Sequence, residues 1–193
     1  MVRFGMARIA ERSKLTPDEY LAWERIQASK HEYFDGEVFA MAGGSPRHNR
    51  LCSSVNAALV NKLAAKCNVF TSDQRLRVQD RRYVYADVVV VCGPPVVEHD
   101  DVIVNPTIVV EVLSPSTEQY DRGLKWDSYQ TRESLTDYIL VSQDRSRIEH
   151  FGRALGGCWS YTAANAGGTI TLTDGTVLDI DAIFAGAFEL KGD

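Results

Sequence analysis

The chain has 193 residues, of which 45% are hydrophobic and 24% are charged, as in an ordinary globular domain. Its formal net charge of -5 excludes a general basic coat for nucleic acid, although a local basic patch is compatible with it. Because no apolar run approaches the roughly 18 residues of a membrane span, we expect no membrane association.

Residues 1–14 hold four basic residues and one acidic residue, and we expect a basic tail there, with an Arg-rich targeting peptide as the alternative. Residues 15–193 are expected to form a single domain, because they contain neither an internal repeat nor a long linker. The four cysteines are scattered without C-x-x-C spacing. We therefore expect neither a disulfide framework nor a zinc site, and a reducing, cytoplasmic location.

Helix and turn signals dominate the first third of the chain. Residues Thr16-Pro17-Asp18-Glu19 form a capping box, which predicts a helix to about residue 28. Asp35-Gly36 predicts a tight hairpin between strands at 31–34 and 37–41. Ser45-Pro46 predicts the start of a second helix, to about residue 66, with four apolar residues on one face: Leu51, Val55, Leu59 and Leu63.

Apolar strands dominate the rest. Residues 84–92 and 107–113 read as central strands, followed by a helix from a capping box at Ser116 to about residue 132 and by a third buried strand at 137–142. From residue 147 onward, short strands separated by glycine-bearing turns predict an antiparallel C-terminal extension. The expected fold class is therefore α/β, with a mixed central sheet flanked by helices.

Two acidic residues interrupt the apolar strands. Asp87 precedes a run of four valines, and Glu111 lies between Val110 and Val112. Each carboxylate alone is more often on the solvent face of an edge strand, but two buried carboxylates require a cation. Lys125 lies in the following helix, four residues after Asp121, and its spacing suits either a surface ion pair or delivery of its ammonium to the carboxylates.

The segments Glu111-Val112-Leu113-Ser114-Pro115-Ser116-Thr117 and Tyr120-Asp121-Arg122-Gly123-Leu124-Lys125, together with Asp87, resemble the Uma-type restriction endonucleases of the PD-(D/E)XK superfamily. The similarity extends over about residues 15–152 and implies a restriction-endonuclease-like fold. It implies that Asp87 and Glu111 are the two motif carboxylates and that Glu37 is an additional acidic residue near the metal. Two positions depart from the superfamily pattern: Ala86 replaces the usual proline, and Leu113 replaces the usual lysine, whose role then falls to Lys125.

The resemblance implies an endonuclease that hydrolyses phosphodiester bonds in nucleic acid, with DNA as the expected substrate. Mg²⁺, or Mn²⁺ in its place, would be held by Asp87, Glu111 and the Val112 carbonyl, and Lys125 would assist the attacking water. A homodimer is expected, because duplex cleavage requires two cuts. His48 and the arginines at 75, 77, 81 and 82 could contact phosphates, or they could be solvated surface residues.

Two other functions stay open. The chain could be a catalytically weak or inactive binding module with the nuclease fold, as Ala86 and Leu113 suggest. It could also be a two-carboxylate glycosidase, in which Asp87 and Glu111 flank a sugar. Lys125 discriminates the nuclease from the glycosidase, because a glycosidase has no special need for it.

Overall fold

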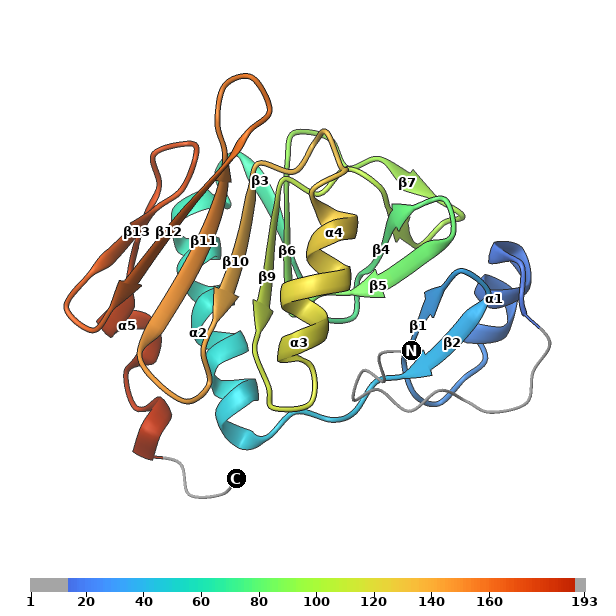
Figure 1. The fold of residues 1–193 in the computed structure, drawn as a ribbon, viewed down its shortest axis with the longest axis horizontal. Helices are drawn as coiled ribbons and strands as arrows, with labels where there is room; N and C mark the ends of the chain where they lie inside the picture. Colours follow the sequence, from blue (N-terminus) through green and yellow to red (C-terminus); the bar gives the residue numbers. More distant parts are fainter. Residues whose placement is uncertain (1–13, 190–193) are drawn as a thin grey trace.

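A computed structural model of the chain describes residues 14–189. Its central sheet has six strands in the order β12-β11-β10-β9-β6-β3 (Figure 1). Within this sheet β9 and β10 run parallel, and the other neighbours are antiparallel. The predicted mixed sheet is therefore confirmed. Its strands are β3 (Cys67–Thr71), β6 (Val88–Cys92), β9 (Ile108–Val112), β10 (Asp137–Val141), β11 (Arg147–Arg153) and β12 (Trp159–Asn165).

A second six-stranded sheet lies beside the first, in the order β2-β1-β5-β4-β8-β7. The chain passes from β5 in this sheet to β6 in the central sheet through Ala86 and Asp87. The prediction of one continuous strand over residues 84–92 is therefore wrong, since the apolar run supplies two strands of different sheets. The strands of the second sheet are β1 (His31–Phe34), β2 (Glu37–Ala40), β4 (Arg75–Gln79), β5 (Arg82–Tyr85), β7 (Val97–Glu98) and β8 (Val102–Ile103).

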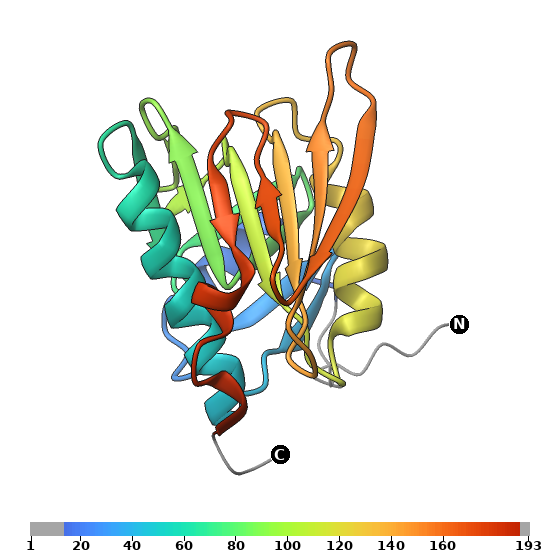
Figure 2. The ribbon, with the colours of Figure 1, turned by 90° about the vertical axis from the view of Figure 1, so that its left-hand side faces the viewer.

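Helices cover both faces of the central sheet (Figures 1 and 2). Helix α2 (Pro46–Leu63) lies on one face, and a helical segment made of α3 (Glu118–Tyr120), a π-helical turn η1 (Asp121–Lys125) and α4 (Trp126–Tyr129) lies on the other. Helix α1 (Pro17–Glu24) packs against β1 and has the predicted capping box of Thr16 and Glu19. It ends at Glu24 rather than near residue 28, and α2 ends at Leu63 rather than near residue 66.

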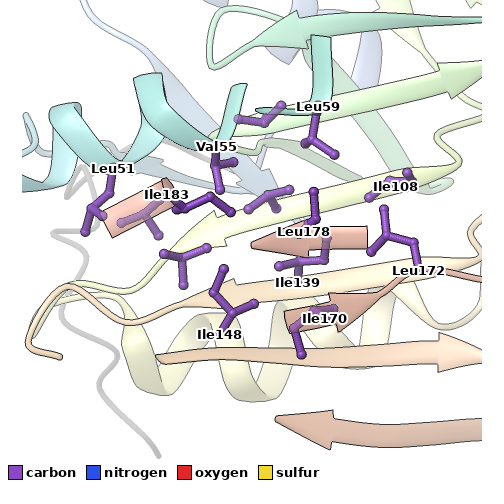
Figure 3. Packing of buried hydrophobic residues seen from close by; sticks show 14 of the residues in the cluster. Leu51, Val55, Leu59, Ile108, Ile139, Ile148, Ile170, Leu172, Leu178 and Ile183 are labelled. Atoms are coloured by element: carbon purple, nitrogen blue, oxygen red, sulfur yellow. The ribbon is translucent and has the colours of Figure 1, made fainter. Parts of the chain in front are cut away.

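The apolar residues of β9 alternate between two cores, as the two-residue period of a strand requires. Ile108, Val110 and Val112 belong to the core under α2, whereas Val109 and Leu113 belong to the core under α4. Figure 3 shows the first core, in which α2 side chains pack over the central sheet. Burial of each large aliphatic side chain there contributes about 1.5–3 kcal/mol. Glu111, between Val110 and Val112, therefore faces the α4 side.

The C-terminal extension is antiparallel, as predicted. Strands β11 and β12 enlarge the central sheet, and β13 (Thr169–Thr171) pairs with β14 (Val177–Asp179) in a separate hairpin on the α2 face (Figure 2). The sequence did not predict α5 (Ile180–Phe184) or the 3₁₀ turn η2 (Ala187–Glu189) that follow. The predicted basic tail, except Lys14, lies outside the described residues.

The cysteines contradict the expectation that the chain has no disulfide. Cys67 on β3 lies opposite Cys92 on β6, and the two form a disulfide, while Cys52 and Cys158 are free. Sequence spacing could not show this pair, because the two residues meet only through strand register. Among the helices of residues 14–189, none is both long and apolar enough to cross a membrane.

Candidate active site

A cavity of about 500 Å³ opens where the two sheets meet. Residues 40–45, the start of α2, the end of β9 and the segment α3–η1 surround it. Four residues singled out from the sequence line it together: Asp87, Glu111, Val112 and Lys125. The fold thus brings into one cavity residues that are up to 38 positions apart in the chain.

Asp87 occupies the junction between the sheets. Val89 pairs with Val109 and Val88 with Val110, so the next step of this register sets Asp87 opposite Glu111. The Val112 amide donates to Oδ2 of Asp87 at 2.7 Å, and Nε2 of His48 lies 3.4 Å from the same oxygen. Burial would raise the pKa of Asp87, but His48 and the Val112 amide outweigh it and lower the pKa below its ordinary value.

Glu111 and Lys125 are in direct contact. Nζ of Lys125 lies 3.0 Å from Oε1 of Glu111, and the Tyr129 hydroxyl donates to the same oxygen at 3.0 Å. Leu113 packs in the apolar core on this side of β9, where the superfamily pattern has a lysine. The segment α3–η1–α4 covers that face of the sheet, so Lys125 contacts Glu111 from the helix that packs on it. A π-helical turn at this point is typical of functional sites.

Lys125 is surrounded by acids, and two of them, Glu32 and Asp121, were not among the site residues predicted from the sequence. Its Nζ lies 3.1 Å from Glu32 and 3.5 Å from Asp121, and it donates to the Tyr85 carbonyl at 3.4 Å. With Asp87 and Glu111, four carboxylates line the cavity, and Lys125 is its single lysine among the described residues. The site therefore has an excess of negative charge.

The pKa values of the pair reflect this excess. Burial raises the pKa of Glu111 well above its ordinary value, and the carboxylates of Asp121, Asp87 and Glu32 add to the rise, although Lys125 opposes it. Burial would lower the pKa of Lys125, but the surrounding carboxylates, Glu111 first, raise it well above its ordinary value. Lys125 is therefore held as an ammonium, whereas the charge of Glu111 is disfavoured without a further cation.

Glu37, the acidic residue expected near the metal, is not among the residues that line the cavity. It lies beside the hairpin turn, opposite Phe34, whereas Glu32 lies opposite Phe39 on the same face. The two glutamates are thus separated along the hairpin by about 7 Å, the length of two residues of strand. Glu32 lines the cavity and contacts Lys125. An acidic residue in a short strand gives no sequence signal for this role.

His48 lines the cavity and is not the surface histidine that its place at the start of a helix suggested. Burial lowers its pKa, but the hydrogen bond and charge of Asp87, together with the Val112 backbone, raise it above the ordinary value of 6.5. Gly44 approaches the ring closely: a Cβ there would lie 2.5 Å from Nδ1. The glycine therefore allows the loop before α2 to pack against His48.

Comparison with known proteins identifies the family. The model of the family described as "Uma2: Putative restriction endonuclease" matches residues 17–189. The chain belongs to this family. It is 38% identical over 176 residues to the uncharacterized protein slr1290 of Synechocystis, covering 90% of this chain and 93% of that protein. It is 32% identical over 161 residues to the uncharacterized protein sll1609 of the same organism, covering 81% and 91%.

A solved structure supports the Uma2 fold. It is a "putative nuclease belonging to DUF820" from Anabaena variabilis, with a TM-score of 0.71 and 15% identity over 90% of this chain and 99% of that one. At this identity the likeness shows the fold alone. The expected restriction-endonuclease-like architecture is thus confirmed.

Further polar groups of the Uma2 chain line the cavity beyond the acids. The Ser114 hydroxyl lies 3.0 Å from the hydroxyls of both Ser116 and Thr117, and Thr117, the N-cap residue of α3, makes no side-chain capping bond. The predicted capping box at Ser116 is therefore wrong. Gln143, which follows β10, is only 6% exposed, and the buried Oε1 of its side chain has no hydrogen-bond partner within residues 14–189. A buried acceptor without a partner costs free energy, and a donor from a bound ligand would remove that cost.

Three of the four arginines that could have contacted phosphates are engaged within the protein. Arg75 pairs with Asp101, Arg77 with Glu98, and Arg82 donates to Ser128 and stacks on Phe34. Among the four, only Arg81 is exposed. Arg75, Arg77 and Arg82 therefore mainly stabilise the second sheet and its contacts with neighbouring segments.

Proposed function

We propose that this protein is a Mg²⁺-dependent endonuclease that hydrolyses phosphodiester bonds, with DNA as its substrate. The observation that carries the proposal is the single cavity in which Asp87, Glu111, Val112 and Lys125 meet. Four carboxylates line that cavity and three of them contact its lysine, which leaves the cavity short of positive charge. A glycosidase would not require this lysine, so the arrangement favours phosphodiester chemistry.

The residues present fit a magnesium ion. Asp87, Glu111 and the backbone carbonyl of Val112 offer oxygen atoms, which are the ligands that Mg²⁺ prefers. Oε1 of Glu111 is engaged by Lys125 and Tyr129, and no hydrogen bond within residues 14–189 reaches Oε2. When bound, the ion supplies positive charge to the phosphodiester and lowers the pKa of a water.

Lys125 is assigned an electrostatic role. Its raised pKa and its carboxylate partners keep it charged, so it is a poor proton acceptor. It orients Glu111 and offsets the negative charge that develops on the phosphate during attack by water. His48, held by Asp87 and of raised pKa, can offer a proton or a hydrogen bond to a phosphate oxygen.

Substrate contacts would come from the rim of the cavity. Helix α2 has 18 residues and begins at the cavity, and the positive end of its dipole favours a phosphate there. Gln143 offers both a donor and an acceptor to the nucleic acid. Because cleavage of a duplex requires two cuts, we infer a homodimer.

The test is nicking of supercoiled plasmid DNA by purified parent protein and by Asp87→Asn. The parent should nick DNA with Mg²⁺ or Mn²⁺ and not with EDTA, and Asp87→Asn should be inactive. Glu149→Gln, which alters a buried acid outside the cavity, is the control and should retain activity. Equal cleavage by Asp87→Asn would contradict the proposal, and failure of the parent on DNA and RNA would favour the inactive binding module.

A further inference from the structure

Three side chains of different ligand chemistry meet where α2 passes the start of β6. His48 and Cys52 are four residues apart on α2 and so share one face of the helix. Sγ of Cys52 lies 3.5 Å from Nδ1 of His48, and Nε2 of His48 lies 3.4 Å from Oδ2 of Asp87. One ligand atom from each residue lies within 4.8 Å of the other two, and all three residues are half-buried.

The chemistry of this set differs from that of the magnesium ligands. Imidazole and thiolate suit borderline or soft cations, whereas Mg²⁺ takes oxygen ligands. Zinc binds sulfur at about 2.3 Å and nitrogen or oxygen at about 2.0–2.2 Å, so its ligands lie roughly 3–4 Å from one another. A set with one atom from each residue spans at most 4.8 Å here, so side-chain shifts of about 1 Å would bring the three atoms to these separations. Three protein ligands beside an open cavity leave the fourth position for water, as in an open zinc site.

We propose that His48, Cys52 and Asp87 bind a divalent cation of the zinc type, at a site that shares Asp87 with the magnesium site. Binding forms a bond between the metal and Sγ of Cys52 and releases the thiol proton to solvent. Because Asp87 serves both sites, occupation by zinc withdraws it from magnesium and inhibits cleavage. The binding of zinc stands on the geometry alone, and only the inhibition rests on the proposed function.

The direct test uses Co²⁺, whose bond to a thiolate gives a charge-transfer absorption band in the near ultraviolet. The parent should show this band at one Co²⁺ per chain, and Cys52→Ser should lose it and bind Co²⁺ at least ~10-fold more weakly. Cys158→Ser, which removes the other free cysteine, is the matched control and should keep both the band and the affinity. Anaerobic buffer without reductant preserves the Cys67–Cys92 disulfide, so that Cys52 and Cys158 are the two free thiols that the variants compare.

Retention of the band in Cys52→Ser, or its loss in Cys158→Ser, would overturn the site. If Cys52→Ser folds poorly, Cys52→Ala serves instead, because it keeps Cβ and removes only the sulfur. A cysteine that merely fills space beside α2 would give no band in the parent, and that result also refutes the proposal.

The shared ligand is tested without activity. Excess Mg²⁺ should raise the Kd for Co²⁺ in the parent, and no effect of Mg²⁺ would refute the sharing of Asp87. If the parent cleaves DNA, Zn²⁺ should inhibit it at least ~10-fold more strongly than it inhibits Cys52→Ser. Equal inhibition would refute the regulatory role, whereas a parent with the cobalt band but no cleavage would contradict the proposed function alone.

Discussion

Replacing Glu111 by glutamine separates a metal ligand from a structural ion pair. Glutamine keeps the volume and an oxygen that can still accept from Lys125 and Tyr129. It removes one carboxyl group from a cavity that is lined by four of them and by a single lysine among the described residues. Because the pKa of Glu111 lies well above its ordinary value, its charge is disfavoured without metal, and its loss should cost little.

The expected magnitudes differ clearly between the two cases. Without metal, the free energy of unfolding of Glu111→Gln should stay within about 1 kcal/mol of the parent. If Glu111 and Lys125 were instead a structural pair, the loss would be about 3–5 kcal/mol. For the parent, a metal at 100 times its Kd adds about 2.7 kcal/mol of stability. Glu111→Gln should lose most of this increment.

The assay is urea denaturation of parent and variant, in EDTA and in saturating Mn²⁺. Glu149→Gln is the control, because Glu149 is a buried acid that pairs with Arg122 outside the cavity. It should be less stable than the parent and keep the full increment from Mn²⁺. A loss of 3 kcal/mol or more for Glu111→Gln in EDTA, or an undiminished increment from Mn²⁺, would refute the reasoning.

Three further predictions follow from the structure. Lys125→Met removes the ammonium that contacts three acids, so it should lower the free energy of unfolding in EDTA by about 3–5 kcal/mol. It should also slow plasmid nicking at least ~100-fold, and equal cleavage by parent and variant would exclude Lys125 from the chemistry. Gln143→Met removes a buried carbonyl oxygen without a partner, so it should raise stability by about 1 kcal/mol yet increase the KM for DNA, and an unchanged KM would exclude a substrate contact. Hydrogen bonds from Arg122 lower the pKa of Glu149 from 4.5 to about 2, so its contribution, roughly 1–3 kcal/mol, should be present above pH 4.5 and lost as pH falls toward 2. The free energies of unfolding of parent and Glu149→Gln should therefore converge across that window, and a constant difference would contradict this assignment.

The sequence predicted the middle of the central sheet well because β6, β9 and β10 lie in apolar runs, and Glu111 stood out within one of them. It could not show that residues 84–92 change sheets at Asp87, because both parts are equally apolar. Nor could spacing decide between two roles for Lys125. The structure shows that Lys125 contacts Asp121 and Glu111 together, since the helix packs onto the face of β9 that carries Glu111.

Other parts of the site depend on tertiary contacts that no local pattern records. Glu32 reaches Lys125 only because β1 lies beside β5, whose end leads to Asp87. In the sequence, His48 and Cys52 are only two residues spaced four apart. They come together with Asp87 because α2 packs against the start of β6. The Cys67–Cys92 disulfide likewise depends on the register of two strands.

The most direct measurement is the anomalous density of Mn²⁺ in crystals of the parent protein. The account predicts one peak in the cavity, within about 2–2.6 Å of a carboxylate oxygen of Asp87, a carboxylate oxygen of Glu111 and the Val112 carbonyl. The two carboxylates should then approach within about 6 Å of each other. Density found only elsewhere, or carboxylates too far apart to share one ion, would contradict the account.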